Sequence, residues 1–123
     1  MLSPTMRRVL ERAVARAIDS SAFSDVVSPE ITPGRGVPRP TLRALVRRGM
    51  LVPVEGHLLE SYALTDEGYA ACAAFVNAHA RQLAEVGRLA MERSPWPGIR
   101  ARGHMQMRAA QAALVRLQEV SDG

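Results

Sequence analysis

The amino-acid sequence predicts a mainly α-helical fold with one small β-hairpin and long helices in its C-terminal half. Through residues 6–18 apolar side chains recur every three or four positions, which is the spacing of one buried helix face. Two short apolar runs, 50–54 and 58–64, flank a turn that contains glycine and indicate a hairpin. Residues 66–92 contain many alanines and no proline, as expected of a long helix.

Length and composition favour a small folded protein of a reducing compartment. The chain has 123 residues, of which 47% are hydrophobic, enough for one domain with a core and one appended element. The N-terminus lacks the apolar segment of a signal peptide, and no stretch of about 18 apolar residues occurs. Cys72 is the single cysteine and permits no internal disulfide. We therefore expect a cytoplasmic protein that does not enter a membrane.

The positive charge is unevenly distributed along the chain. The net charge is +4 and the sequence pI is about 10.5, values that suit a nucleic-acid partner. Residues 1–50 carry nine arginines and four acids, whereas residues 51–68 carry four acids and no arginine. All sixteen basic residues are arginine, which a GC-rich genome also produces without functional demand. The position of the arginines is therefore more informative than their number.

A first helix and a less regular segment precede the basic helix. Ser3 and Pro4 suit the N-cap and the first helical position of the first helix. After it, Ser20 or Ser21 can cap a short second helix that buries three apolar side chains, Phe23, Val26 and Val27. The following prolines and glycines predict irregular chain up to residue 37.

A short basic helix is predicted for residues 39–48. Pro40 suits its first turn, and Gly49 suits its C-terminal end. Leu42 and Leu45 lie on one side at the spacing of a buried stripe. Beside that stripe, arginines recur every four residues and form a row, Arg39, Arg43 and Arg47.

Basic helix, hairpin and long helix follow one another in the order of a winged helix-turn-helix. The sequence TLRALVRRGMLV followed by YALTDEG resembles the recognition helix and the two wing strands of MarR-like and PadR-like transcriptional regulators. The matching residues are Leu42, Leu45, Gly49, Met50 and Leu51, then Tyr62, Leu64, Thr65 and Gly68. The resemblance implies a winged helix-turn-helix domain in residues 1–68 and a helical extension for dimerisation in residues 66–123.

The resemblance also implies a mode of binding to double-stranded DNA. Helix 39–48 is the expected recognition helix, and its arginines can read guanine in the major groove. The side chains expected in the groove are Arg39, Thr41, Arg43 and Arg47. Those expected near phosphates are Arg7, Arg8, Arg35 and Arg48.

The hairpin favours a second interpretation. Its side chains include Glu55, His57 and Glu60, and carboxylates are repelled by the DNA backbone. A winged helix can also serve as a protein-binding module. The alternative is therefore a protein-interaction adaptor that does not bind DNA, with the hairpin and the C-terminal helices as contact surfaces.

The C-terminal half predicts two helices and a dimer interface. The sequence Ser94-Pro95-Trp96-Pro97-Gly98 ends the long helix, and we expect Trp96 to anchor this turn against the core or a partner. A last helix is predicted for about residues 104–120. The long helix has an apolar stripe with small residues, which suits close packing against a symmetry mate. The residues expected in a homodimer interface are Cys72, Val76, Leu83, Val86, Ala90, Leu114 and Leu117.

No constellation of catalytic or metal-binding residues occurs in the sequence. There is no glycine-rich phosphate loop, and no nucleophile has a matched histidine and acid. His79 and His104 lack ligand spacing with each other and with Cys72. We therefore expect neither an enzyme nor a cofactor, and no residue pattern specifies a small-molecule effector.

Overall fold

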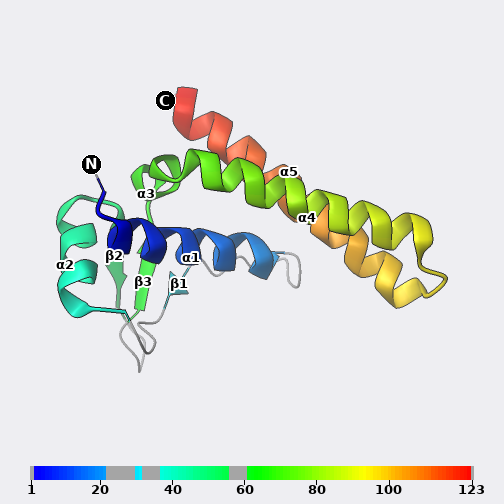
Figure 1. The fold of residues 1–123 in the computed structure, drawn as a ribbon, viewed down its shortest axis with the longest axis horizontal. Helices are drawn as coiled ribbons and strands as arrows, with labels where there is room; N and C mark the ends of the chain where they lie inside the picture. The colour runs from blue at the N-terminus through cyan, green and yellow to red at the C-terminus, as the bar shows by residue number, and fades with distance from the viewer. Residues whose placement is uncertain (1, 22–29, 32–36, 56–60, 123) are drawn as a thin grey trace.

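The fold is mainly helical with a small antiparallel sheet, as the sequence predicts. The computed structural model describes residues 2–21, 30–31, 37–55 and 61–122. Figure 1 shows α2 at one end of the molecule and the turn between α4 and α5 at the other. The elements in chain order are α1 (Pro4–Ser21), β1 (Glu30–Ile31), α2 (Arg39–Arg47), β2 (Leu51–Val54), β3 (Ser61–Leu64), α3 (Asp66–Ala71), α4 (Ala73–Arg93) and α5 (Pro97–Asp122).

The first helix begins where the sequence predicts and runs to Ser21. The Ser3 hydroxyl accepts a hydrogen bond from the Met6 N–H at 3.2 Å, which satisfies one of the free donors of the first turn. Ser21 belongs to the last turn of α1, and its hydroxyl donates a hydrogen bond to the Ile18 carbonyl at 2.7 Å. The expected second helix around Phe23, Val26 and Val27 lies outside the described residues.

The sheet has three strands in the order β1-β3-β2, and both pairs are antiparallel. Leu51 lies opposite Leu64, and Val54 lies opposite Ser61. The predicted hairpin is thus present, although residues 58–60 of its expected second strand fall outside the described range. β1 pairs Glu30 with Ala63 in a segment for which the sequence predicts irregular chain. A strand of two residues is too short to produce a recognisable sequence pattern.

The long helix predicted for residues 66–92 is interrupted, so that prediction is wrong in one respect. Cys72 has φ −110° and ψ 28°, and its N–H bonds to the Tyr69 carbonyl at 3.1 Å. α3 therefore ends at Ala71, and α4 starts in a new direction. The bend allows Tyr69 on α3 and Val76 on α4 both to be buried in the core.

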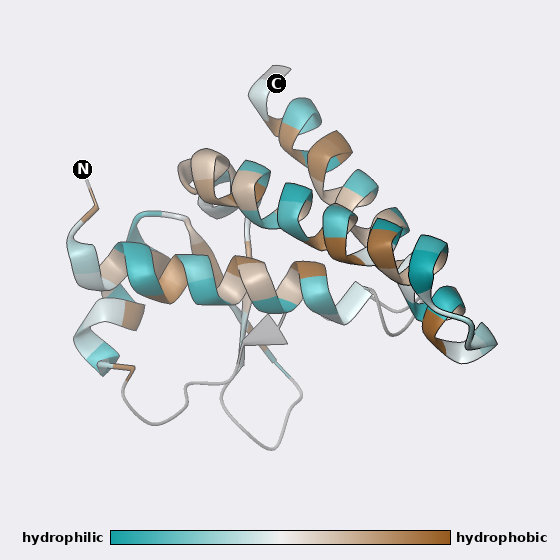
Figure 2. Ribbon diagram, turned by 45° about the vertical axis from the view of Figure 1, so that its right-hand side comes forward, coloured by the Kyte–Doolittle hydropathy of each residue, from teal (hydrophilic) through white to brown (hydrophobic). Residues whose placement is uncertain are grey.

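α4 and α5 form an antiparallel helical hairpin, which we call the arm. α5 begins at Pro97, about two turns before the start predicted at residue 104, because prolines are tolerated in the first helical turn. Hydrophilic and hydrophobic residues alternate along both helices in an amphipathic pattern (Figure 2). Trp96 in the connecting turn is 65% exposed, so it does not anchor the turn against the core of this chain.

One hydrophobic core extends across the boundary predicted at residues 66–68. The core cluster joins Leu10 and Val14 of α1 with Leu45 of α2, Val76 of α4 and Ala110 of α5. The Tyr69 hydroxyl donates a hydrogen bond to the Ala113 carbonyl at 3.0 Å and connects α3 to α5. Within the described ranges, none of the helices has both the length and the apolar character needed to cross a bilayer.

Candidate nucleic-acid interface

α2 presents a sharply divided surface. Leu42 and Leu45 are 2% and 0% exposed and fix one side of the helix to the core. Arg43 and Arg47 are exposed and lie one turn apart, separated by about 6 Å along the axis. Because the arginine pair faces away from the two leucines, α2 can approach a partner without disturbing the core.

The side chains of Arg43 and Arg47 are not neutralised by neighbours. Neither forms a side-chain hydrogen bond or an ion pair with any part of the chain that the structure describes. Arg116, by comparison, lies 4.3 Å from the centre of the Tyr69 ring and 3.3 Å from a carboxylate oxygen of Asp66. The two α2 guanidinium groups therefore keep their donors for an external acceptor.

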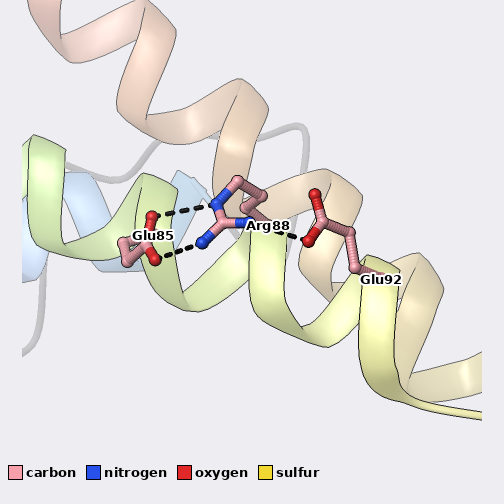
Figure 3. A network of polar contacts seen from close by, with 3 residues as sticks. All are labelled: Glu85, Arg88 and Glu92. Carbon is pink, nitrogen blue, oxygen red and sulfur yellow. Dashed lines mark hydrogen bonds and ion pairs between the residues drawn. The ribbon is translucent and has the colours of Figure 1, made fainter.

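In the arm, Arg88 interacts with two glutamates of its own helix, Glu85 and Glu92 (Figure 3). Arg88 donates two hydrogen bonds to Glu85, at 3.0 Å and 2.5 Å, and one to Glu92 at 2.7 Å. The hydrogen bonds from Arg88 lower the pKa of Glu85, and the two carboxylates raise the pKa of Arg88. Arg88 is therefore paired with a carboxylate on the preceding turn of α4 and with another on the following turn.

The other residues near α2 that were predicted to contact the groove or phosphates differ in their exposure and in their interactions. Arg39 and Arg48 are exposed, and each already interacts with another group of the chain. Thr41 is half-buried and lies toward the edge of the exposed face. Arg35 lies outside the described residues.

Arg7 and Arg8 are both exposed on α1 but face different directions. Successive residues of an α-helix point about 100° apart around its axis, so Arg7 lies to one side of Arg8. Arg8 belongs to the outward face, together with Arg12 and Arg16, which are also exposed. Arg12 and Arg16 are not among the predicted phosphate contacts, although their spacing of four residues is visible in the sequence.

The described part of the hairpin supplies no cation. Glu55 is exposed at the end of β2, and Val52 on the same strand is 47% exposed. His57 and Glu60 lie outside the described residues. Positive charge in this region therefore comes from α2.

The predicted dimer residues divide into three groups. Cys72, Val76 and Leu117 are buried within one chain, covered by its own helices. Leu83, Ala90 and Leu114 are half-buried, and Val86 is 49% exposed. Because α5 covers most of the apolar stripe of α4, a second copy can reach only the outer residues of the arm.

The described residues show no metal site, and hollows lie between the helices around α3 and α5. No group of three or more histidine, cysteine, aspartate or glutamate side chains among them can hold a metal ion. His79 Nε2 lies 2.8 Å from an oxygen of Asp19 and ties α4 to the end of α1. An apolar hollow between α1, α3 and α5 measures about 110 Å³, below the roughly 300–1,000 Å³ of ligand pockets. A larger hollow of about 540 Å³ lies between α3 and α5, and most of its lining is charged: Asp66, Glu67, Ala70, Arg116, Glu119 and Val120. Ligand pockets are lined mainly by apolar side chains, a majority that this hollow lacks.

Comparison with protein-family models, with curated proteins and with solved structures finds no match to this chain.

Proposed function

We propose that the chain is a winged-helix, sequence-specific DNA-binding regulator of transcription that acts as a homodimer in the cytoplasm. α2 serves as the recognition helix and enters the major groove. β2 and β3 form the wing, and the arm carries the dimer contacts. MarR-like and PadR-like regulators, which the sequence resembles, bind DNA, and this proposal gives the chain the same function.

One observation carries the proposal: on the side away from its buried leucines, α2 exposes two arginines whose side chains have no partner among the described residues. Arginine is the commonest reader of guanine, because its guanidinium can donate two parallel hydrogen bonds to O6 and N7. Arg43 and Arg47, one turn apart, can contact neighbouring bases, and Arg39 lies one turn before them. Arg48 lies beside the same groove and is assigned to phosphate, as are Arg7 and Arg8 of α1.

The proposed dimer uses the exposed side of the arm. Val86 is the accessible member of the predicted interface, with Leu83, Ala90 and Leu114 at its edge. Two-fold symmetry would match a pseudo-palindromic site whose half-sites lie about one or more helical turns apart.

The test is a double variant of the recognition helix. After selection of a preferred site from random duplexes, Arg43→Ala plus Arg47→Ala should abolish preference for that site and leave the free energy of unfolding unchanged within about 0.5 kcal/mol. Arg81→Ala plus Arg108→Ala, two exposed arm positions, removes the same charge elsewhere. If the α2 variant keeps the affinity of the wild type, α2 is not the reader.

The adaptor remains the second candidate because of the apolar surface of the arm. Among the described residues, the large exposed apolar side chains other than Val52 all lie on the arm or its turn: Val86, Trp96, Ile99, Met107 and Val115. An exposed tryptophan is typical of protein-binding hot spots. The adaptor predicts no appreciable binding to DNA.

A further inference from the structure

α1 carries a second row of exposed arginines, of which the proposed function uses only Arg8. Arg8, Arg12 and Arg16 are spaced by four residues and therefore share one face of the helix. All three are exposed, whereas the opposite face buries Leu10 and Val14 completely. We call these three residues the α1 row.

Acids on α1 do not neutralise the α1 row. The side chains of Arg8, Arg12 and Arg16 form no hydrogen bond or ion pair with the portion of the chain that the structure describes. Asp19, near the end of the helix, is engaged with His79 at 2.8 Å. Glu11 is half-buried and forms no ion pair with these arginines among the described residues. A positive strip that has no partner among the described residues favours a polyanion as its ligand.

The location of the α1 row relates it to the proposed recognition helix. α1 packs against α2, and its N-terminal end lies beside α2 while the helix runs away toward the arm (Figure 1). From Arg8 to Arg16 the row spans about 12 Å, at a rise of 1.5 Å per residue. Each DNA strand carries one phosphate per about 3.4 Å of axis and winds as it rises, so a straight row of this length can reach about two or three phosphates.

We propose that the α1 row binds the sugar-phosphate backbone of duplex DNA next to the segment that α2 reads. The row is a second contact surface that strengthens binding to any sequence and lengthens the protected segment. It leaves the choice of sequence to α2, because backbone contacts position a protein without reading bases. This inference rests on the proposed DNA-binding function.

The experiment measures the salt dependence of binding to random-sequence duplex DNA for Arg12→Gln plus Arg16→Gln. Each phosphate contact contributes about 0.9 to the slope of log K against log salt concentration, so the variant should lose about 2 in slope per protomer. Affinity should fall by the same factor for random and selected sites. The matched control, Arg81→Gln plus Arg108→Gln, makes the same charge change on the arm and should leave the slope near that of the wild type.

The outcomes separate this inference from the function proposed for α2. If the α1 variant still binds DNA with the wild-type salt slope, the α1 row does not contact phosphate, and the function proposed for α2 is unaffected. A slope that falls equally in the arm control overturns it too, because net charge then explains the effect. Random binding that depends on α1 but shows no site preference and no response to Arg43→Ala plus Arg47→Ala supports the α1 row and removes α2 as reader. Absence of any DNA binding by the wild type overturns both.

Discussion

The Thr65 hydroxyl donates a hydrogen bond to the Gly49 carbonyl at 2.5 Å and accepts one from the Gly68 N–H at 3.1 Å. A single side chain therefore caps α3 and holds the turn that ends α2. Gly49 has φ +75°, a backbone conformation that favours glycine. At Gly68, a Cβ atom would collide with the Met50 carbonyl, so the two segments meet without room for a side chain. This junction sets the position of α2 relative to the sheet.

We expect Thr65→Val to lower the free energy of unfolding by about 1–2 kcal/mol, because valine has a similar shape but cannot cap α3 or bond to Gly49. Thr65→Ser keeps the hydroxyl and should lie much closer to the wild type. Urea denaturation of the three proteins provides the comparison. Equal stability of the valine and serine variants would show that the hydroxyl does not hold the junction.

The arm depends on a close approach of two glycines. A Cβ atom on Gly87 would lie 2.5 Å from the Gly103 carbonyl oxygen, a contact with backbone that cannot move aside. Gly87→Ala should therefore destabilise the protein by about 1–2 kcal/mol, even though alanine favours a helix by about 1 kcal/mol. Gly98→Ala is the control, because no atom lies within 4 Å of its added Cβ, and it should be neutral or stabilising. Thermal unfolding of both variants tests this, and a stabilising Gly87→Ala would contradict the close packing.

Because the Cys72 thiol is buried, we expect the free energy of unfolding to fall at high pH. Burial raises the pKa of its thiol, the charge of Glu11 raises it further, and Arg7 opposes both. The folded state therefore holds the proton more tightly than the unfolded state. This contribution is complete below the ordinary thiol pKa of about 8.5 and is lost as the pH rises through the folded pKa.

The measurement is urea denaturation of the wild type and of Cys72→Ala between about pH 7.5 and pH 10. The free energy of unfolding of the wild type should fall more steeply with pH. A smaller fall should persist in the variant, because burial also raises the pKa of Tyr69. Identical pH dependence in the two proteins would mean that Cys72 does not titrate differently on folding.

The proposed dimer predicts a specific effect of Val86→Glu. Val86 is 49% exposed in the single chain, so a charge there should change the free energy of unfolding of the protomer by no more than about 0.5 kcal/mol. In an apolar dimer contact the same charge would be buried without a partner and should dissociate the dimer. Sedimentation should then give the protomer mass for Val86→Glu and the dimer mass for a control, Gln111→Glu, on the exposed surface of α5. A dimer that survives Val86→Glu does not use this side of the arm.

Local patterns predicted the elements well where one face of a helix or strand is buried. The apolar period of α1, the end of α2 at Gly49 and the cap at Thr65 each depend on near neighbours, and the structure confirms them. The bend at Cys72 was not predicted, because it serves contacts distant in sequence, such as that between Tyr69 and Ala113.

The surface of the candidate site was harder to predict than its helices. Spacing made Arg43 and Arg47 candidates, and the structure shows that both are exposed. Arg88 differs from them because acids one turn away engage it, a pairing that its spacing from Glu85 and Glu92 already indicates. The dimer prediction assumed that the apolar stripe of α4 lacks a partner in its own chain. α5 covers much of that stripe, and a helical period cannot reveal which helix will do so.

The most direct test of the central claim is titration of the wild-type protein with random-sequence duplex DNA at about 50 mM and 200 mM salt. If about six phosphates are contacted, log K should fall with log salt concentration at a slope near −5. That result would support the DNA-binding proposal and justify selection of the preferred site. Absence of binding even at the lower salt concentration would contradict the proposal and leave the adaptor, with the exposed apolar residues of the arm as its contact surface.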